Sequence, residues 1–221
     1  MSHDQSDTHT EGEPTRLPTD TDDGLLVIFS GPSGVGKTTI TRGVERRVPD
    51  AVFSVSATTR AKTDADVDGV DYRFIDDAEF DAMIAEDDFL EWADVFGKRY
   101  GTPRPWVDEQ LRRGRVVILE IDVEGAKQVK SRRPEATAIF ILPPSSEELL
   151  ERLRSRKRED EAAIQRRYAE AQREIADARA CGAYDHFLIN EDLEAAIDEA
   201  VDTVTRARET RQARSRGPVG Q

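Results

Sequence analysis

Cysteine is nearly absent from this chain, because Cys181 is the only one among 221 residues. No disulfide bond can form within the chain, and this favours a reducing compartment. Long hydrophobic runs are missing too, since no stretch reaches the roughly 18 apolar residues of a membrane span. The first residues also lack the basic start and the apolar run of a secretory signal peptide. We therefore expect a soluble cytoplasmic protein that has no membrane partner.

Positive charge is in short supply as well. The chain has 32 Lys and Arg, of which only six are lysine, against 45 Asp and Glu, and its net charge is −13. Such an acidic protein repels the phosphate backbone of nucleic acids, so we expect no nucleic-acid partner. The acidic excess is compatible either with a salt-adapted cytoplasm or with an ordinary acidic enzyme.

The two ends of the chain differ in composition from its middle. Residues 1–24 are acidic and carry little apolar surface, which predicts a disordered acidic tail. Residues 207–221 are rich in arginine and end in Gly217-Pro218-Val219-Gly220, which predicts a basic flexible tail. We therefore expect one folded domain over residues 25–206.

A phosphate-binding loop follows the first apolar segment of this domain. The apolar run 25–29 precedes the pattern G-x-x-x-x-G-K-T at residues 31–38. A buried strand that ends in this loop lets backbone N–H groups surround a polyphosphate at the N-terminus of the next helix. Lys37 would reach the outer phosphates, and the Thr38 hydroxyl would bind Mg²⁺. The expected nucleotide-binding residues of this segment are Gly31, Pro32, Ser33, Gly34, Val35, Gly36, Lys37, Thr38 and Thr39.

Short apolar strands alternate with amphipathic helices after the loop, which predicts an α/β fold with a parallel sheet covered by helices. The expected strands are residues 25–30, 52–56, 72–75, 89–95, 116–121, 138–142 and 187–189. The stretch 53–102 interrupts the alternation and is richer in short strands, so we expect an inserted antiparallel piece there.

Two carboxylates, Glu120 and Asp122, end the expected strand 116–121. Ligands of open parallel sheets bind beyond the carboxyl ends of the strands, and residues two apart on a strand face the same way. Both side chains are therefore expected near the phosphate loop, facing the same side. Alternatively, they cap or hydrogen-bond neighbouring loops.

Arginines gather between residues 152 and 167. Arg152 and Arg156 lie four residues apart and would share a helix face, and Arg167 follows in a second cluster. Planar guanidinium forks can stabilise the charge of a phosphoryl group in transfer. The other interpretation is a solvated basic helix face balanced by the acids at 159–161. The phosphate loop in the same chain favours the first, an arginine lid over about 152–170.

Several short segments resemble the successive signatures of guanylate kinases, in order and in spacing. They are residues 54–60, 69–72, 89–93, 100–102, 119–126, 141–145 and 189–193. The resemblance spans roughly residues 25–206 and is more specific than the loop alone. It implies a P-loop kinase fold and an ATP:GMP phosphotransferase that forms GDP and ADP with Mg²⁺. It also implies dGMP as a second acceptor, and either a monomer or a homo-oligomer.

The resemblance also implies which residues bind GMP. Glu91, Thr102 and Asp122 match positions that read guanine, while Tyr100 matches a contact to the phosphate. Guanine presents N1–H and its amino group side by side, and a carboxylate can accept from both, whereas adenine lacks this pair. The implied GMP-binding set is Ser56, Arg60, Tyr72, Glu91, Tyr100, Thr102, Glu120 and Asp122.

On the donor side, the resemblance implies that ATP lies on the phosphate loop. Asn190 matches a position beside the adenine ring, although an Asn after a strand is also an ordinary turn residue. The implied catalytic residues are Lys37, Arg152, Arg156 and Arg167.

The sequence departs from the family pattern at two positions. Thr63 stands where guanylate kinases commonly have a second arginine for the GMP phosphate, and Lys157 stands where a glycine is usual. Loss of one bidentate fork predicts weaker GMP binding with the chemistry retained. Two other functions share the fold: a phosphopeptide-binding module without kinase activity, and a kinase for a phosphorylated sugar. The intact Lys37 and Thr38 argue against the first.

Overall fold

Strand β1 (Leu25–Ser30) lies at the centre of a five-stranded sheet in the computed structural model, which describes residues 23–95, 97–155 and 160–215. The strand order is β2-β7-β1-β8-β9, and every pairing in this core sheet is parallel. The other four strands are β2 (Ala51–Phe53), β7 (Val116–Glu120), β8 (Thr137–Leu142) and β9 (His186–Ile189).

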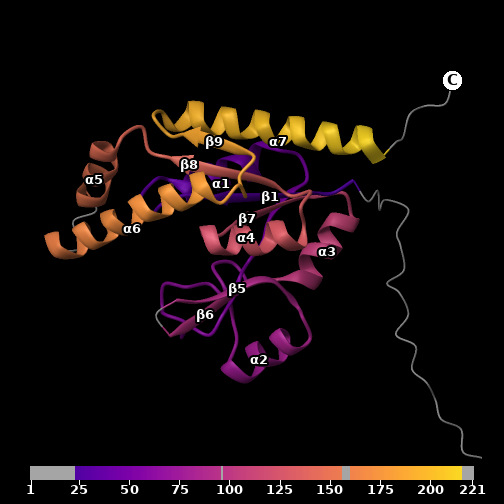
Figure 1. The fold of residues 1–221 in the computed structure, drawn as a ribbon. Coiled ribbons are helices and arrows are strands. Elements are labelled where there is room, and N and C mark those ends of the chain that lie inside the picture. The colour runs from indigo at the N-terminus through magenta and orange to yellow at the C-terminus, as the bar shows by residue number, and fades with distance from the viewer. Residues whose placement is uncertain (1–22, 96, 156–159, 216–221) are drawn as a thin grey trace, which may run out of the picture.

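Helices cover both faces of this sheet (Figure 1). Val27 and Phe29 point to the face covered by α1 (Lys37–Arg47) and α7 (Leu193–Ser215). Leu26 and Ile28 point to the other face, where α3 (Arg104–Arg112) and α4 (Val123–Arg132) pack. Because alternate residues of β1 are buried on opposite faces, the strand reads as one continuous apolar run. The expected α/β fold with a helix-covered parallel sheet is confirmed.

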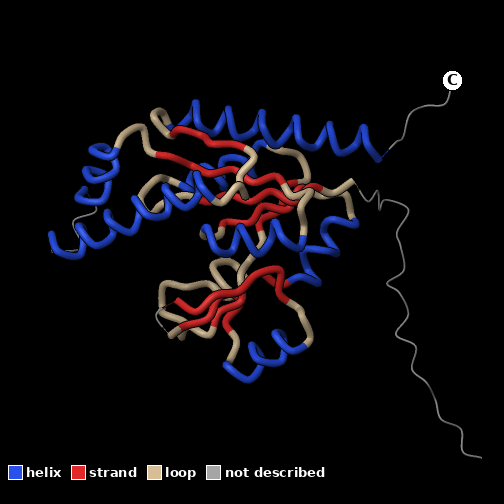
Figure 2. Tube along the Cα trace, viewed as in Figure 1, coloured by secondary structure: helices blue, strands red, loops and turns tan. Residues whose placement is uncertain are grey.

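A second, four-stranded sheet lies beyond α4 and forms the insert (Figure 2). Its order is β4 (Arg73–Phe74), β3 (Ala57–Thr58), β6 (Lys98–Pro103) and β5 (Phe89–Val95), with α2 (Asp77–Ala85) packed beside it. Strand β6 runs antiparallel to both β3 and β5, whereas β3 and β4 are parallel. The antiparallel expectation is therefore correct for three strands and wrong for the β3–β4 pair.

Two helices follow the carboxyl end of β8, in the segment where the lid is expected. They are α5 (Ser146–Ser155), which lies to one side of the core sheet, and α6 (Glu161–Ala180), which runs from there back toward α4 (Figure 1). Leu149 and Leu153 of α5 pack against Ile164 and Ala171 of α6. Arg156 and Lys157 lie outside the described residues, so the central part of the expected lid is not placed.

Two expectations about element ends are corrected by the structure. Strand β7 ends at Glu120, and Asp122 is the N-cap of α4, where its side chain accepts from Gly125 N; the two carboxylates therefore do not continue one strand. Residues 207–215 belong to α7 and not to a flexible tail. Arg208 anchors this part of the helix by donating to the carbonyls of Pro49, at 2.9 Å, and Gly114, at 3.2 Å. Within the described ranges, no helix combines the length and apolar character needed to cross a bilayer.

Candidate functional site

The phosphate loop joins the end of β1 to the first turn of α1. Gly34 and Gly36 adopt φ values of 89° and 99°, a region that residues with a side chain rarely occupy. Lys37 Nζ donates to the carbonyl of Gly31 and, at 3.3 Å, to that of Pro32. Its ammonium group therefore lies at the loop, beside the N-terminus of α1, where an anion is favoured. Thr39 follows in the same turn of α1 and is exposed.

The side chain of Asn190 packs against this loop. It follows β9, is 5% exposed, and donates from its side-chain amide to Val35 O at 2.7 Å. A side chain at Gly36 would meet the same amide nitrogen at 2.7 Å, so only glycine leaves room for this contact. The structure thus gives Asn190 a contact with the loop, which the sequence pattern did not indicate.

Glu120 joins the end of β7 to the start of α1. Its Oε1 accepts from the Thr38 hydroxyl at 2.8 Å, and its Oε2 accepts from the Thr41 hydroxyl at 3.0 Å. Thr41 was missed by the sequence analysis, because it lies beyond the loop motif and its partner is 79 residues away. A hydroxyl and a carboxylate at one point form an oxygen donor set that suits Mg²⁺, which binds through few protein ligands together with substrate phosphates.

Two arginines of the expected lid make hydrogen bonds at the loop or beside it. Arg152 of α5 donates from Nη2 to the carbonyl of Asn190 at 3.0 Å, and its Nε is paired with Glu148 at 3.0 Å. Arg167 of α6 donates to the hydroxyl of Ser33 in the loop. Arg167 therefore contacts the phosphate loop directly, and Arg152 contacts the residue that supports the loop, whereas Arg156, the third expected lid arginine, lies outside the described residues.

Glu91 and Thr102 face each other on neighbouring strands of the insert. Thr102 Oγ1 donates to Glu91 Oε1 at 2.6 Å, and both residues are buried. The other carboxylate oxygen, Oε2, points toward Gly125 of α4, where an added Cβ would meet it at 3.0 Å and Asp122 Oδ1 at 3.3 Å. The structure therefore brings Glu91, Thr102 and Asp122 together, as expected. It also gives Gly125 a packing role that the sequence analysis missed, because the motif does not show which side chain approaches it.

Burial changes the ionisation of Glu91. Loss of hydration raises its pKa to about 7, and the nearby negative charge of Asp122 acts in the same direction, while the Thr102 hydrogen bond opposes it. Near neutral pH the free protein therefore holds both the carboxylate and its protonated form. The ionised form offers Oε2 as an acceptor for a second donor.

A second group of insert residues gathers around Arg60. Its Cζ lies 5.2 Å from the centroid of the Tyr72 ring, and the Tyr72 and Tyr100 rings meet edge to face with centroids 5.6 Å apart. Burial raises the pKa of Tyr72, so its hydroxyl stays protonated and can donate. Ser56 lies between β2 and β3, and its carbonyl accepts from Arg73 N at 2.9 Å. The cationic side chain and two phenols form a cluster that suits a phosphate group.

One side chain of α4 ties the insert to the core. Gln128 accepts from Trp92 N at 3.2 Å and donates to Trp92 O at 3.1 Å, so it pairs with the backbone of β5 as a neighbouring strand would. Trp92 follows Glu91 directly in the sequence. This double hydrogen bond therefore holds Glu91 next to the N-terminus of α4, where Asp122 and Gly125 lie.

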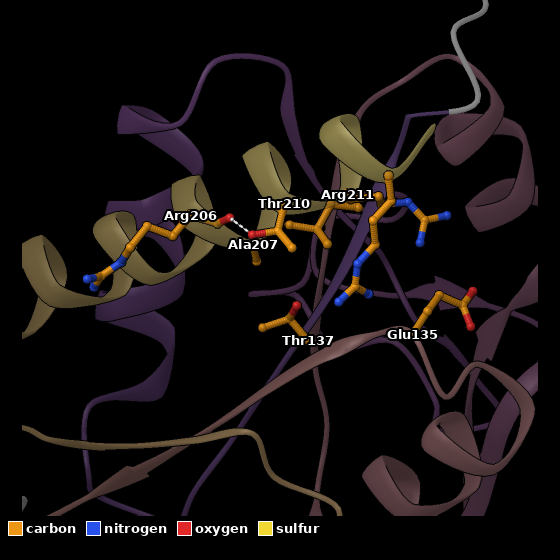
Figure 3. Close-up of a pocket in the computed structure, with 8 residues that line it drawn as sticks. Glu135, Thr137, Arg206, Ala207, Thr210 and Arg211 are labelled. Atoms are coloured by element: carbon orange, nitrogen blue, oxygen red, sulfur yellow. Dashed lines mark hydrogen bonds between the residues drawn. The ribbon is translucent and has the colours of Figure 1, made fainter. Parts of the chain in front are cut away.

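A cavity of about 600 Å³ lies elsewhere, between α7 and the amino ends of the core strands (Figure 3). Its lining includes Leu25 at the start of β1, Thr137 at the start of β8, and Arg206 and Arg211 of α7. The phosphate loop follows the opposite, carboxyl end of β1. This cavity is therefore separate from the candidate site.

The chain is similar to known proteins in sequence and in fold. The family model described as guanylate kinase matches residues 24–207. A guanylate kinase of Carboxydothermus hydrogenoformans is 50% identical over 182 residues, which is 82% of this chain and 88% of that protein. One of Gloeobacter violaceus is 52% identical over 177 residues, 80% of this chain and 84% of that protein. The crystal structure of guanylate kinase from Anaplasma phagocytophilum matches with a TM-score of 0.64 and 32% identity, over 84% of this chain and 86% of that one.

Proposed function

The chain belongs to the guanylate kinase family, the ATP:GMP phosphotransferases, and we propose how its residues share the transfer that makes GDP and ADP. The core, with the phosphate loop and α5–α6, binds ATP. The insert, residues 53–102, binds GMP. The proposal is supported by two separate clusters, one of cations and hydroxyls around the loop and one of buried polar groups around Glu91.

On the donor side, the loop 31–36 and Lys37 hold the ATP phosphates, while Arg152 and Arg167 surround them from the lid. Phosphoryl transfer needs little covalent help and much stabilisation of charge, which these cations provide. We assign Thr38 and Glu120 to Mg²⁺, because their side chains already lie together. When bound, Mg²⁺ neutralises charge on the phosphates. This assignment moves Glu120 from the GMP side to the metal side.

On the acceptor side, Glu91 accepts from N1–H and the amino group of guanine, with Thr102 and Asp122 beside it. Arg60, Tyr72, Tyr100 and Ser56 hold the GMP phosphate. An oxygen of this phosphate is already anionic at neutral pH, so no general base is needed to activate it. The residues act by aligning that oxygen with the γ-phosphorus of ATP and by excluding water.

The observation that carries the acceptor assignment is the buried Glu91, with one oxygen held by Thr102 and the other directed toward α4. AMP would leave these buried acceptors unpaired, and such sites discriminate by up to about 10⁴-fold. A sugar phosphate has no guanine edge to pair with them.

The test is release of ADP from Mg-ATP with GMP, AMP, UMP or a ribose phosphate as acceptor. We expect turnover with GMP, turnover lower by orders of magnitude with the others, and loss of activity in Lys37→Ala. A Glu91→Gln variant is the acceptor-side control, since it keeps the loop and lid intact. Comparable turnover with AMP or a ribose phosphate would contradict the acceptor assignment.

A further inference from the structure

The carboxylate of Asp66 collects four hydrogen bonds in the loop between β3 and β4. Its two oxygens accept from Nη1 and Nη2 of Arg60, each at 2.9 Å. Its Oδ2 also accepts from the backbone N–H and the hydroxyl of Thr63, each at 2.7 Å. The side chain of Asp66 is only 14% exposed and that of Arg60 is 27% exposed. The Arg60 hydrogen bonds hold the pKa of Asp66 well below its usual range, so the carboxylate is charged across the neutral range.

These contacts occupy the Nη1–Nη2 edge of the Arg60 guanidinium and leave its Nε–Nη2 edge open. Nη1 also donates to Ala61 O at 3.1 Å, so both its protons are used. The Nε–H and one Nη2–H of Arg60 have no partner among the described residues. A guanidinium has five N–H donors in one plane, and the Nε–Nη2 edge can hold two oxygens of one phosphate.

Aromatic rings fix the plane of the same guanidinium. Its Cζ lies 5.2 Å from the Tyr72 ring centroid and 5.3 Å from that of Phe74. The backbone N–H of Arg60 donates to Thr58 Oγ1 at 3.1 Å, which anchors the residue to β3. Arg60 is therefore held by its backbone N–H, by the two rings beside its guanidinium plane and by the Asp66 carboxylate at its Nη1–Nη2 edge.

Two other aspartates accept backbone hydrogen bonds in and next to the loop that carries Asp66. Asp71 accepts from Val67 N at 2.7 Å, and Asp68 accepts from Phe74 N at 3.1 Å. Asp66 therefore sits in a hydrogen-bonded turn and not on an unrestrained segment. Thr63, which replaces the usual second arginine, contributes two of the donors that orient the Asp66 carboxylate.

We propose that Asp66 is a positioning residue for the acceptor phosphate: with Thr63 it holds the Nη1–Nη2 edge of Arg60, so that Arg60 meets the GMP phosphate with its Nε–Nη2 edge. The proposal rests on the GMP-binding function proposed above. Because Thr63 supplies no charge, phosphate binding depends more strongly on the orientation of Arg60. Asp66 itself opposes the approach of an anion, so orientation must outweigh this repulsion for the proposal to hold.

The experiment compares steady-state constants of Asp66→Asn with those of Asp64→Asn. Asp66→Asn loses the charge and one acceptor, and we expect the KM for GMP to rise about tenfold, with kcat and the KM for ATP within about twofold. Asp64→Asn removes an equal charge from the same loop, and Asp64 has no described contact with Arg60. We expect this control to leave the KM for GMP unchanged or slightly lowered.

Three further readouts separate positioning from a general structural role. The inhibition constant of guanosine, which lacks the phosphate, should not change in Asp66→Asn. In an Arg60→Ala background, Asp66→Asn should add no further increase to the KM for GMP. Asp66→Glu keeps a bidentate acceptor and should recover part of the loss, and Thr63→Val, measured even if Asp66→Asn fails to fold, should raise the KM for GMP.

An unchanged or lower KM for GMP in Asp66→Asn would overturn the proposal and identify Asp66 as a competitor of the phosphate. An equal effect on guanosine, or an undiminished effect without Arg60, would also overturn it. Wild-type protein that does not phosphorylate GMP would instead refute the proposed function, so the two failures are distinguishable.

Discussion

Glu91 is subject to two opposing demands at the scale of a single residue. The proposed recognition of guanine needs its carboxylate ionised, while burial and the charge of Asp122 favour the protonated form and raise its pKa to about 7. The Thr102 hydrogen bond only partly offsets this effect. A residue of this kind reduces the stability of the empty protein and becomes fully satisfied only when the ligand donates to it.

The first prediction concerns the pH dependence of GMP use. The value of kcat/KM for GMP reports ionisations of the free enzyme, so it should rise with pH up to a plateau above an apparent pKa of about 7. One unit below that pKa it should be lower by about tenfold. In Glu91→Gln this limb should vanish, leaving only the ionisation of the GMP phosphate itself. A wild-type profile that matches that of the variant would contradict the assignment.

The second prediction concerns stability. An acid whose pKa is raised by folding destabilises the folded state as pH increases between its unfolded value, 4.5, and its folded value, about 7. Glu91→Gln should therefore increase the free energy of unfolding by roughly 1–3 kcal/mol at pH 8, and should have little effect near pH 4.5. Chemical denaturation at both pH values measures this. A destabilised variant at pH 8 would show that the carboxylate is satisfied in the folded protein by contacts other than that with Thr102.

Single residues also show what the sequence could and could not predict. Glu91 and Thr102 were predicted as site residues because each lies in a contiguous motif, and the structure places Thr102 Oγ1 2.6 Å from Glu91 Oε1. The link between Glu120 and Thr41 joins positions 79 residues apart, and no local pattern indicates such a distance. The Asp66 contact with Arg60 is local, but four aspartates in one short stretch do not reveal which of them meets the arginine.

At the scale of elements, four of the five core strands were predicted well, whereas the expected strand 52–56 shares only two residues with β2 (Ala51–Phe53), and the strands of the insert were predicted less well. Strand β1 is buried on both faces and carries a continuous apolar run, so its sequence and its position agree. Strand β6 reads Lys-Arg-Tyr-Gly-Thr-Pro and lacks such a pattern. It forms because β3 and β5 pair with it on both sides, and this information is not local. The last turns of α7 are polar and were not predicted as helix for the same reason, because the Arg208 hydrogen bonds that anchor them join residues far apart in the sequence.

The third prediction concerns the support that β9 gives to the phosphate loop through Asn190. Asn190→Ala removes the donor to Val35 O and should lower the free energy of unfolding by about 1–3 kcal/mol. If Asn190 acts through the loop, the KM values for ATP and GTP as donors should rise by similar factors, because both share the triphosphate. The KM for GMP should stay constant.

A direct contact with the adenine ring makes a different prediction for the same variant. ATP would then lose more affinity than GTP, and stability would change little. Donor competition assays with the two nucleotides, together with a denaturation curve, separate the two roles. Loss of ATP preference without loss of stability would contradict the loop-support role.

At the scale of the whole molecule, the proposed GMP site lies where the insert meets α4 of the core. Glu91 and Thr102 belong to the insert, while Asp122 and Gly125 begin α4 of the core, and Gln128 ties the two parts through the backbone of Trp92. A ligand that contacts both sides adds to this connection. Arginines gather in the sequence between residues 152 and 167, although the net charge of the chain is −13.

The fourth prediction follows from this bridging position. A ligand that binds only the folded state at 100 times its Kd adds about 2.7 kcal/mol to the free energy of unfolding. For a chain of this size, GMP should therefore raise Tm by about 5–10 °C, while AMP at the same concentration should raise it much less. In Glu91→Gln the GMP shift should shrink toward that of AMP, although this variant is more stable without ligand at pH 8. If GMP and AMP gave equal shifts in the wild type, binding would rest on the phosphate alone, and the guanine contacts assigned to Glu91 would be wrong.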